Sequence, residues 1–118
     1  MTTQKKDAER VELLQGTLDV LILKTLLAGR EHGQGIARTI QATSGDALLI
    51  DHGSLYPALQ RLEKRKWIRA KWGVSSNNRR ARFYELTAKG RKQVAIETDR
   101  WNRLVDAMGR VLSPEGES

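Results

Sequence analysis

The chain has no cysteine and only two prolines, and its longest apolar runs are four residues long. The absence of cysteine excludes disulfides, thiol catalysis and a cysteine-ligated metal. Runs of four are far shorter than the roughly 20 apolar residues that a membrane-spanning helix needs. Residues 1–10 are polar and lack the apolar core of a signal peptide. We therefore expect a soluble, cytoplasmic protein with no membrane partner.

Enzymatic chemistry has little support in the residues present. His32 and His52 are far apart in the sequence, with no paired acid at metal-ligand spacing. Gly53-Ser54 lacks the Gly-x-Ser-x-Gly pattern of a nucleophile elbow. We expect no catalytic residues, no metal site and no cofactor, and we expect His32 to stabilise the turn in which it lies.

Positive charge is concentrated in one part of the chain. The 118 residues suffice for one domain with a modest core, and they carry a net charge of +7. Nine lysines or arginines and one acid, Glu63, lie between positions 61 and 82. Most charge runs are simply solvated, solubilising surfaces. That explanation would require nearly all the net charge to fall in this segment by chance. The cluster favours binding to a polyanion.

The residues after Asp51 have the pattern of a helix. Apolar side chains repeat there at intervals of four and three, at Leu55, Leu59 and Leu62. The position of Pro57 is compatible with two different starts for this helix. If Asp51 is the N-cap, Pro57 removes one backbone hydrogen bond and bends the first turns. If the helix begins near Tyr56, Pro57 occupies a favoured first position.

A β-hairpin is predicted after this helix. Residues 68–71 and 82–86 alternate with the period of two that is typical of strands. Residues 73–81 between them are a polar tip, too long for a two-residue turn. A helix followed by a basic-tipped hairpin predicts a winged helix-turn-helix, which is mainly α with a small β-hairpin (α+β).

The remaining helices complete the predicted organisation. Residues 13–28 form an apolar helix, residues 30–34 a turn and residues 36–43 a second, short helix. Thr87 is the N-cap of a last helix over residues 88–111. We divide the chain into a flexible tail (1–12), a winged helix-turn-helix DNA-binding domain (13–86), a C-terminal dimerisation helix (87–112) and a tail (113–118).

The last helix carries an apolar seam that favours self-association. Val94, Trp101 and Met108 repeat at intervals of seven, and a small core has little room for them. We expect the seam to meet its counterpart in a second copy, with the first helix assisting. The expected dimer interface consists of Leu14, Leu18, Val94, Trp101, Leu104, Val105, Met108 and Val111.

Several sequence blocks together resemble the PadR family of bacterial transcriptional regulators. They are Leu14-Gln15-Gly16-Thr17-Leu18-Asp19, His32-Gly33, Gly53-Ser54-Leu55-Tyr56-Pro57 and Asn77-Asn78-Arg79-Arg80. The single C-terminal helix resembles the compact subfamily without a separate effector domain. The resemblance implies a transcriptional repressor that binds a palindromic operator in double-stranded DNA as a homodimer. It also implies a small planar aromatic effector stacked on Trp101, whereas plain interface packing is the alternative for that side chain.

Two positions depart from the family pattern. Gln34 stands where the family commonly has an aromatic residue, which weakens the case for a DNA contact there. Lys66 stands where a glycine commonly ends the recognition helix. A lysine in the left-handed conformation costs on the order of 1 kcal/mol, so the alternative is a helix that runs on toward Trp67.

The DNA-binding candidates lie on the recognition helix, on the wing and at Gln34. In a helix-turn-helix the second helix enters the major groove, where glutamine pairs with adenine and basic side chains bind phosphates. Core packing is the alternative role for Tyr56, and helix capping is the alternative for Ser54. The helix candidates are His52, Ser54, Tyr56, Gln60, Arg61 and Lys64. The wing candidates are Asn77, Asn78, Arg79, Arg80 and Arg82.

Two other functions remain open from the sequence. A winged-helix module that binds RNA or a protein partner, without operator specificity, would carry the same basic patch but needs no twofold symmetry. Attachment to an anionic membrane surface is disfavoured, since no predicted helix pairs a basic face with a bulky aromatic one. Trp67 is expected in the core, and Trp72 over the wing or against a partner.

Overall fold

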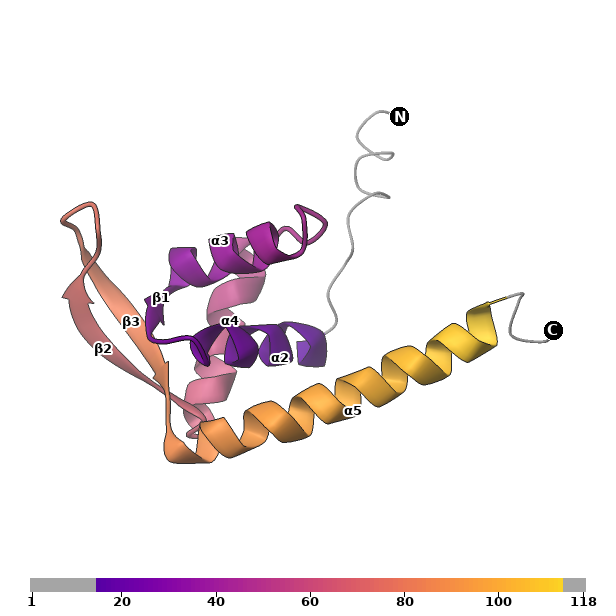
Figure 1. Cartoon of the computed structure of the whole chain (residues 1–118). Coiled ribbons are helices and arrows are strands. Elements are labelled where there is room, and N and C mark those ends of the chain that lie inside the picture. Colours follow the sequence, from indigo (N-terminus) through magenta and orange to yellow (C-terminus); the bar gives the residue numbers. More distant parts are fainter. Residues whose placement is uncertain (1–14, 114–118) are drawn as a thin grey trace.

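A computed structural model describes residues 15–113, and it has the predicted winged-helix architecture (Figure 1). Four helices and one antiparallel sheet with the strand order β1-β3-β2 make up this part of the chain. The elements are α2 (Gln15–Leu26), β1 (Glu31–His32), α3 (Gly33–Thr43), α4 (His52–Lys64), β2 (Ile68–Val74), β3 (Arg80–Leu86) and α5 (Ala88–Leu112).

The core lies where α2, α3 and α4 meet the base of the hairpin. The apolar positions of each helix face inward, and four of the fully buried side chains are Ile22, Leu23, Leu55 and Leu59. Ile68 and Leu86 close the core from the hairpin. Trp67 was expected in the core, and it packs against this cluster while staying partly exposed. The core therefore fixes α4 against the hairpin.

The sheet contains a strand that the sequence did not reveal. Residues 30–34 were expected to be a turn, but Glu31 and His32 pair with Tyr84 and Phe83 of β3. α3 then begins at once, with Gly33 and Gln34 in its first turn. The prediction of a turn was wrong because a two-residue strand is too short to show a period of two.

The hairpin strands are longer than predicted, and the tip is correspondingly shorter. β2 and β3 pair continuously from Ile68 opposite Leu86 to Val74 opposite Arg80. The connection is therefore residues 75–79 rather than the expected 73–81. Val74 and Arg80 are exposed strand ends, so burial does not impose an apolar alternation on them.

The structure shows where α4 starts relative to Pro57 and whether it ends at Lys66, both of which the sequence left open. The Asp51 carboxylate accepts a hydrogen bond of 2.7 Å from the Ser54 backbone N–H, so the helix begins at His52 and contains Pro57. At the other end Lys66 adopts a φ of 63°. The Trp67 N–H donates to the Leu62 carbonyl over 3.1 Å, which ends the helix in a Schellman motif instead of continuing it to Trp67.

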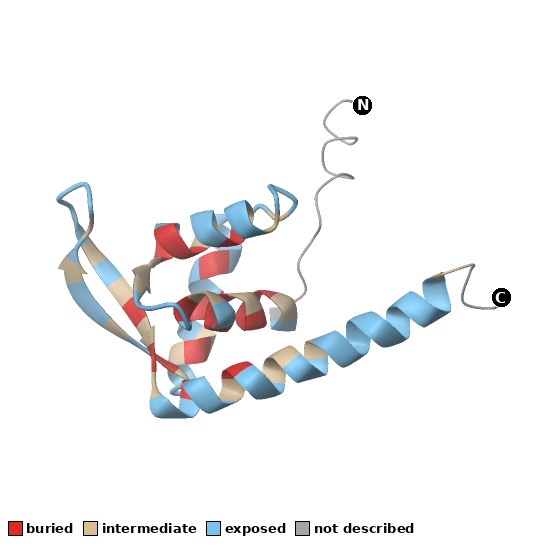
Figure 2. Cartoon of the chain, in the orientation of Figure 1, coloured by how far each residue is buried: buried red, intermediate tan, exposed pale blue. Residues whose placement is uncertain are grey.

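α5 begins against the core and then leaves it. The Thr87 hydroxyl oxygen accepts from the Gly90 N–H over 3.0 Å, which confirms the predicted N-cap. Gly90 and Val94 are buried near α2 and the hairpin base, but the second half of the helix extends away from the rest of the chain (Figures 1 and 2). Across residues 15–113, none of the helices combines the length and apolarity required to cross a bilayer.

Candidate nucleic-acid interface

One face of α4 is buried, and the opposite face presents polar side chains to solvent. His52, Tyr56, Gln60 and Lys64 follow one another at intervals of four, so they form a stripe along the exposed side of the helix. Tyr56 is 40% exposed, which argues against core packing as its main role. Its ring lies 5.8 Å from that of His52.

The start of α3 lies beside this stripe. His32 was expected to stabilise a turn, but it ends β1 and caps α3, since its Nδ1 accepts a 3.0 Å hydrogen bond from the Gly35 N–H. A Cβ at position 33 would lie 2.9 Å from the Tyr56 hydroxyl oxygen. Glycine there allows the Tyr56 ring to approach the helix start, where Gln34 is exposed. These residues come from elements distant in sequence but form one surface.

The tip of the wing is held by its own hydrogen bonds. The Ser75 N–H donates to the Arg79 carbonyl over 2.8 Å, and the Ser75 hydroxyl donates to the same carbonyl over 3.0 Å. Asn78 takes a φ of 62°, a left-handed conformation that asparagine tolerates better than most residues. The turn therefore presents the exposed side chains of Asn77, Arg79 and Arg80 in a defined arrangement.

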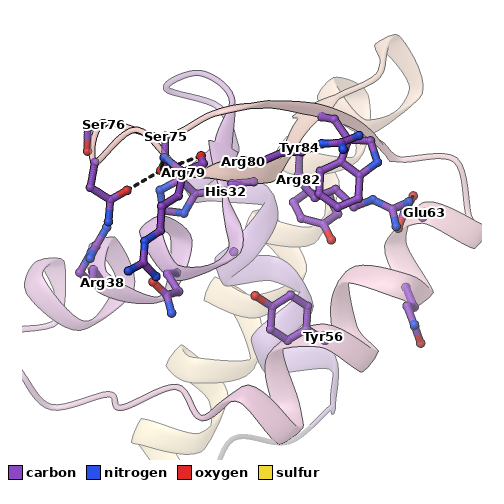
Figure 3. A pocket seen from close by; sticks show the side chains of 16 residues that line it. His32, Arg38, Tyr56, Glu63, Ser75, Ser76, Arg79, Arg80, Arg82 and Tyr84 are labelled. Carbon is purple, nitrogen blue, oxygen red and sulfur yellow. Dashed lines mark hydrogen bonds and ion pairs between the residues drawn. The ribbon is translucent and has the colours of Figure 1, made fainter.

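The wing, α3 and α4 enclose one cleft of about 760 Å³ (Figure 3). Its basic groups are Arg38, Arg79, Arg80 and Arg82, and Glu63 is its one carboxylate. The cleft is lined by His32, Gly33, Gln34, Arg38, Tyr56, Gln60, Glu63, Trp72, Ser75, Ser76, Asn77, Arg79, Arg80, Ala81, Arg82 and Tyr84. A positively charged hollow beside an exposed helix stripe is suited to a phosphate backbone.

An ion pair connects α4 to the wing. Arg82 Nη2 lies 3.0 Å from Glu63 Oε2, and the Arg82 guanidinium carbon is 6.0 Å from the Tyr84 ring centroid. Burial raises the pKa of the Tyr84 hydroxyl, and the nearby Arg82 charge partly opposes that rise. Tyr84 is therefore neutral at physiological pH. Arg82 both pairs with Glu63 and lines the cleft.

Seven of the predicted DNA-binding residues line the cleft, and four others are exposed elsewhere on the surface. Those in the cleft are Gln34, Tyr56, Gln60, Asn77, Arg79, Arg80 and Arg82; those exposed but outside its lining are His52, Ser54, Lys64 and Asn78. Ser54 gives its backbone N–H to the Asp51 cap, so its hydroxyl is not the capping group.

The position of Arg61 differs from the one predicted. It was expected on the exposed side of α4 as a phosphate contact, but its Nη2 lies 2.8 Å from Asp19 Oδ1 of α2. The Asp19 side chain is only 9% exposed and that of Arg61 28%. The Arg61 Nε is buried and has no hydrogen-bond partner among the described residues. Because the buried carboxylate needs a positive partner, Arg61 joins two helices instead of facing a ligand.

Arg38 and Trp72 line the cleft but were not among the predicted DNA-binding residues. Arg38 lies on α3 outside the dense basic cluster, four residues after Gln34, and only that helical spacing indicates a shared face. Trp72 was placed over the wing, and the Arg80 guanidinium carbon lies 4.6 Å from its ring centroid. Within residues 15–113 no three His, Cys, Asp or Glu side chains gather as metal ligands.

The predicted dimer residues divide into three groups. Leu18 and Val94 are 3% and 5% exposed in the core of the chain itself, so they retain almost no surface for a partner. Leu14 lies outside the described residues. The remaining side chains form an apolar stripe on the second half of α5: Trp101, Leu104, Val105, Met108 and Val111, continued by Leu112.

Comparison with known proteins assigns the family. Residues 22–96 match the transcriptional regulator PadR-like family, which is more than half of the chain. The chain belongs to the PadR family. Because this is a family of transcriptional regulators, membership also favours a non-enzymatic role.

Solved transcriptional regulators and a protein known by its sequence are similar to this chain. A transcriptional regulator from Clostridium thermocellum is 25% identical, with a TM-score of 0.74 over 84% of this chain and 93% of the other. A PadR family transcription regulator from Clostridium difficile is 26% identical, with a TM-score of 0.67 over 81% and 98%. An uncharacterised protein from Lysinibacillus sphaericus is 28% identical over 78% of this chain and 84% of its own.

Proposed function

We propose that this PadR-family chain is a sequence-specific DNA-binding regulator. The observation that supports this most strongly is the shared cleft, in which Tyr56 and Gln60 of the α4 stripe face the same space as the wing arginines. α4 is the second helix of the helix-turn-helix, so its stripe enters the major groove while the wing follows the neighbouring phosphates and minor groove. Gln60 and Tyr56 are the best-placed residues to reach base edges or phosphates.

The proposed functional unit is a homodimer built on α5. The apolar stripe from Trp101 to Leu112 belongs to the part of the helix that leaves the core, and Val111 is 84% exposed. An exposed apolar stripe with a helical repeat is typical of a helix that pairs with another. We place the twofold axis at this stripe and leave Leu18 and Val94 out of the interface.

A twofold dimer matches a palindromic operator. Each α4 would occupy the major groove of one half-site, and the half-sites would be about one helical turn (~34 Å) apart. An operator that overlaps a promoter would make the protein a repressor, because bound dimer and polymerase exclude each other. The dimerisation test is Leu104→Glu, which puts a charge into the seam and should give monomers in sedimentation. Arg110→Glu, on the opposite side of the same helix, should leave the dimer intact.

The defining experiment is an electrophoretic mobility shift with the DNA upstream of the protein's own gene. It is run at two salt concentrations and with excess non-specific competitor. Retained preference over the competitor supports operator recognition. Loss of all preference would reduce the activity to general polyanion binding, and a strict monomer at micromolar concentration would favour an RNA- or protein-binding module instead.

An effector that binds between the subunits is the second part of the proposal. Trp101 is partly exposed in this single chain and lies at the start of the apolar stripe, where a flat aromatic ligand could stack on it. Such a ligand would act by changing the spacing of the two recognition helices. Titration with a chemically diverse panel of planar aromatic compounds should quench tryptophan fluorescence; no response in the panel assigns Trp101 to packing alone.

A further inference from the structure

Trp72 is a large apolar side chain on an exposed part of the wing. It is 61% exposed, and Val74, two residues along β2, is 65% exposed. Because strand residues two apart point to the same face, both side chains lie on the sheet face that carries Arg80 and Arg82. Trp72 lines the basic cleft itself.

The surroundings of Trp72 are positively charged. It pairs across the hairpin with Arg82, and the Arg80 guanidinium stacks on its ring at 4.6 Å. Such stacking holds the arginine near the ring face while most of the indole stays open to solvent. The surface is therefore an apolar strip flanked by cations, which fits a ligand whose apolar surface is bordered by phosphates.

The minor groove of duplex DNA has this chemistry. Its walls are the C–H surfaces of deoxyribose, and phosphates border it on both sides. The minor groove of duplex RNA is wide and shallow and displays a 2′-hydroxyl on every sugar. Burying an indole against those hydroxyls gains less, because they lose water without finding a hydrogen-bond partner on Trp72 or Val74.

We propose that Trp72 and Val74 form an apolar contact with the deoxyribose wall of the minor groove, and that this contact makes the wing selective for DNA over RNA. The proposal rests on the DNA-binding function proposed above and adds the basis of discrimination between the two nucleic acids. The arginines supply affinity for either backbone, and the apolar strip supplies the preference.

The test compares one short duplex with the sequence of the DNA upstream of the protein's own gene, prepared both as DNA and as RNA, by fluorescence anisotropy. For the wild-type chain we expect tighter binding to DNA. Trp72→Ser should weaken DNA binding about tenfold and leave RNA binding within about twofold, so that the ratio of affinities falls. Trp72→Phe should keep most of the preference. The matched control is Leu27→Ser, an exposed apolar residue that does not line the cleft.

A second readout guards against a merely structural effect. Intrinsic tryptophan emission should change when wild-type chain binds the DNA duplex, and Trp72→Phe should abolish that change while binding persists. Equal loss of DNA and RNA binding in Trp72→Ser, no loss of either, or an unchanged emission response in Trp72→Phe would each overturn the proposal. A wild-type chain that binds neither duplex would instead refute the proposed DNA-binding function.

Discussion

Asp19 Oδ1 of α2 lies 2.8 Å from Arg61 Nη2 of α4, and this pair ties the recognition helix to the helix on which α5 packs. The carboxylate is almost fully buried, so its charge is compensated mainly by the guanidinium. The pair sets the position of α4 relative to α2. If the proposed DNA binding by α4 is correct, we expect Arg61 to affect it only through the orientation of this helix.

Separating this pair should destabilise the fold. We expect Asp19→Ala to lower the free energy of unfolding by roughly 1–3 kcal/mol, less than for a fully buried pair because Arg61 retains some contact with solvent. Arg61→Met in the Asp19→Ala background should cost less than it does alone, as measured in a denaturation double-mutant cycle. Strictly additive effects would contradict a coupled pair. Arg61→Met should also leave the salt dependence of DNA binding unchanged.

Lys66 is the clearest site for stabilisation. Its φ of 63° is unfavourable for a residue with a Cβ, and the Schellman bonds at the end of α4 require that conformation. Lys66→Gly should raise the free energy of unfolding by about 0.5–1 kcal/mol. Arg65→Gly is the matched control, since Arg65 has a φ of −77° and glycine there should only destabilise. A loss of stability in Lys66→Gly would show that the lysine side chain makes a compensating interaction.

Two glycines of α5 should respond in opposite ways to alanine. A Cβ at Gly90 would lie 1.9 Å from the Trp67 carbonyl oxygen, so Gly90→Ala must displace the backbone and should cost at least about 2 kcal/mol. Gly109 has open space around it, and Gly109→Ala should gain up to about 1 kcal/mol from helix propensity. Thermal denaturation of the two variants measures both effects, and equal responses would refute the packing of α5 against the α4–β2 turn.

The wing arginines should contribute affinity without sequence preference. We expect Arg79→Ala with Arg80→Ala to weaken binding to every DNA sequence and to flatten the log–log salt slope by about two, because each arginine would neutralise one phosphate. Anisotropy titrations over a range of salt concentrations give this slope. An unchanged slope would show that neither arginine binds the DNA backbone.

Glu85 should make stability depend on pH. A hydrogen bond from the Arg69 side chain is the main cause that lowers the pKa of the Glu85 carboxyl, and the charge of Lys71 adds to the effect. A pKa lowered by folding contributes stability above the unfolded-state pKa and loses it as the pH falls through the folded-state pKa. Glu85→Gln should therefore be less stable than wild type at neutral pH, with a difference that disappears in acid. A difference that does not depend on pH would assign the effect to packing.

The fold could be predicted because its signals are local. Leu55, Leu59 and Leu62 mark the buried face of α4 by spacing alone, and Asp51 and Thr87 mark helix starts by their capping chemistry. The strand β1 was not predicted, because two residues are too few to show a period of two. The ends of the hairpin strands were not predicted, because exposed positions such as Val74 need not follow an apolar–polar alternation.

The site was less predictable, because sequence spacing does not reveal a distant partner. Arg61 shares its helix and its charge with Lys64, yet only Arg61 meets Asp19, which lies 42 positions earlier in the chain. Leu18 and Val94 belong to apolar patterns that fit a core or an interface equally well, and only the packing of α5 on α2 decides between these roles.

Hydroxyl-radical footprinting of the complex with the upstream DNA shows whether two copies of the chain bind as a twofold dimer. Two α4 helices related by a twofold axis should protect two half-sites whose centres are about 10 base pairs apart, arranged symmetrically around the palindrome. Leu104→Glu should abolish this paired pattern at protein concentrations that saturate the wild type. A single protected patch, or protection with no preferred position, would contradict the account.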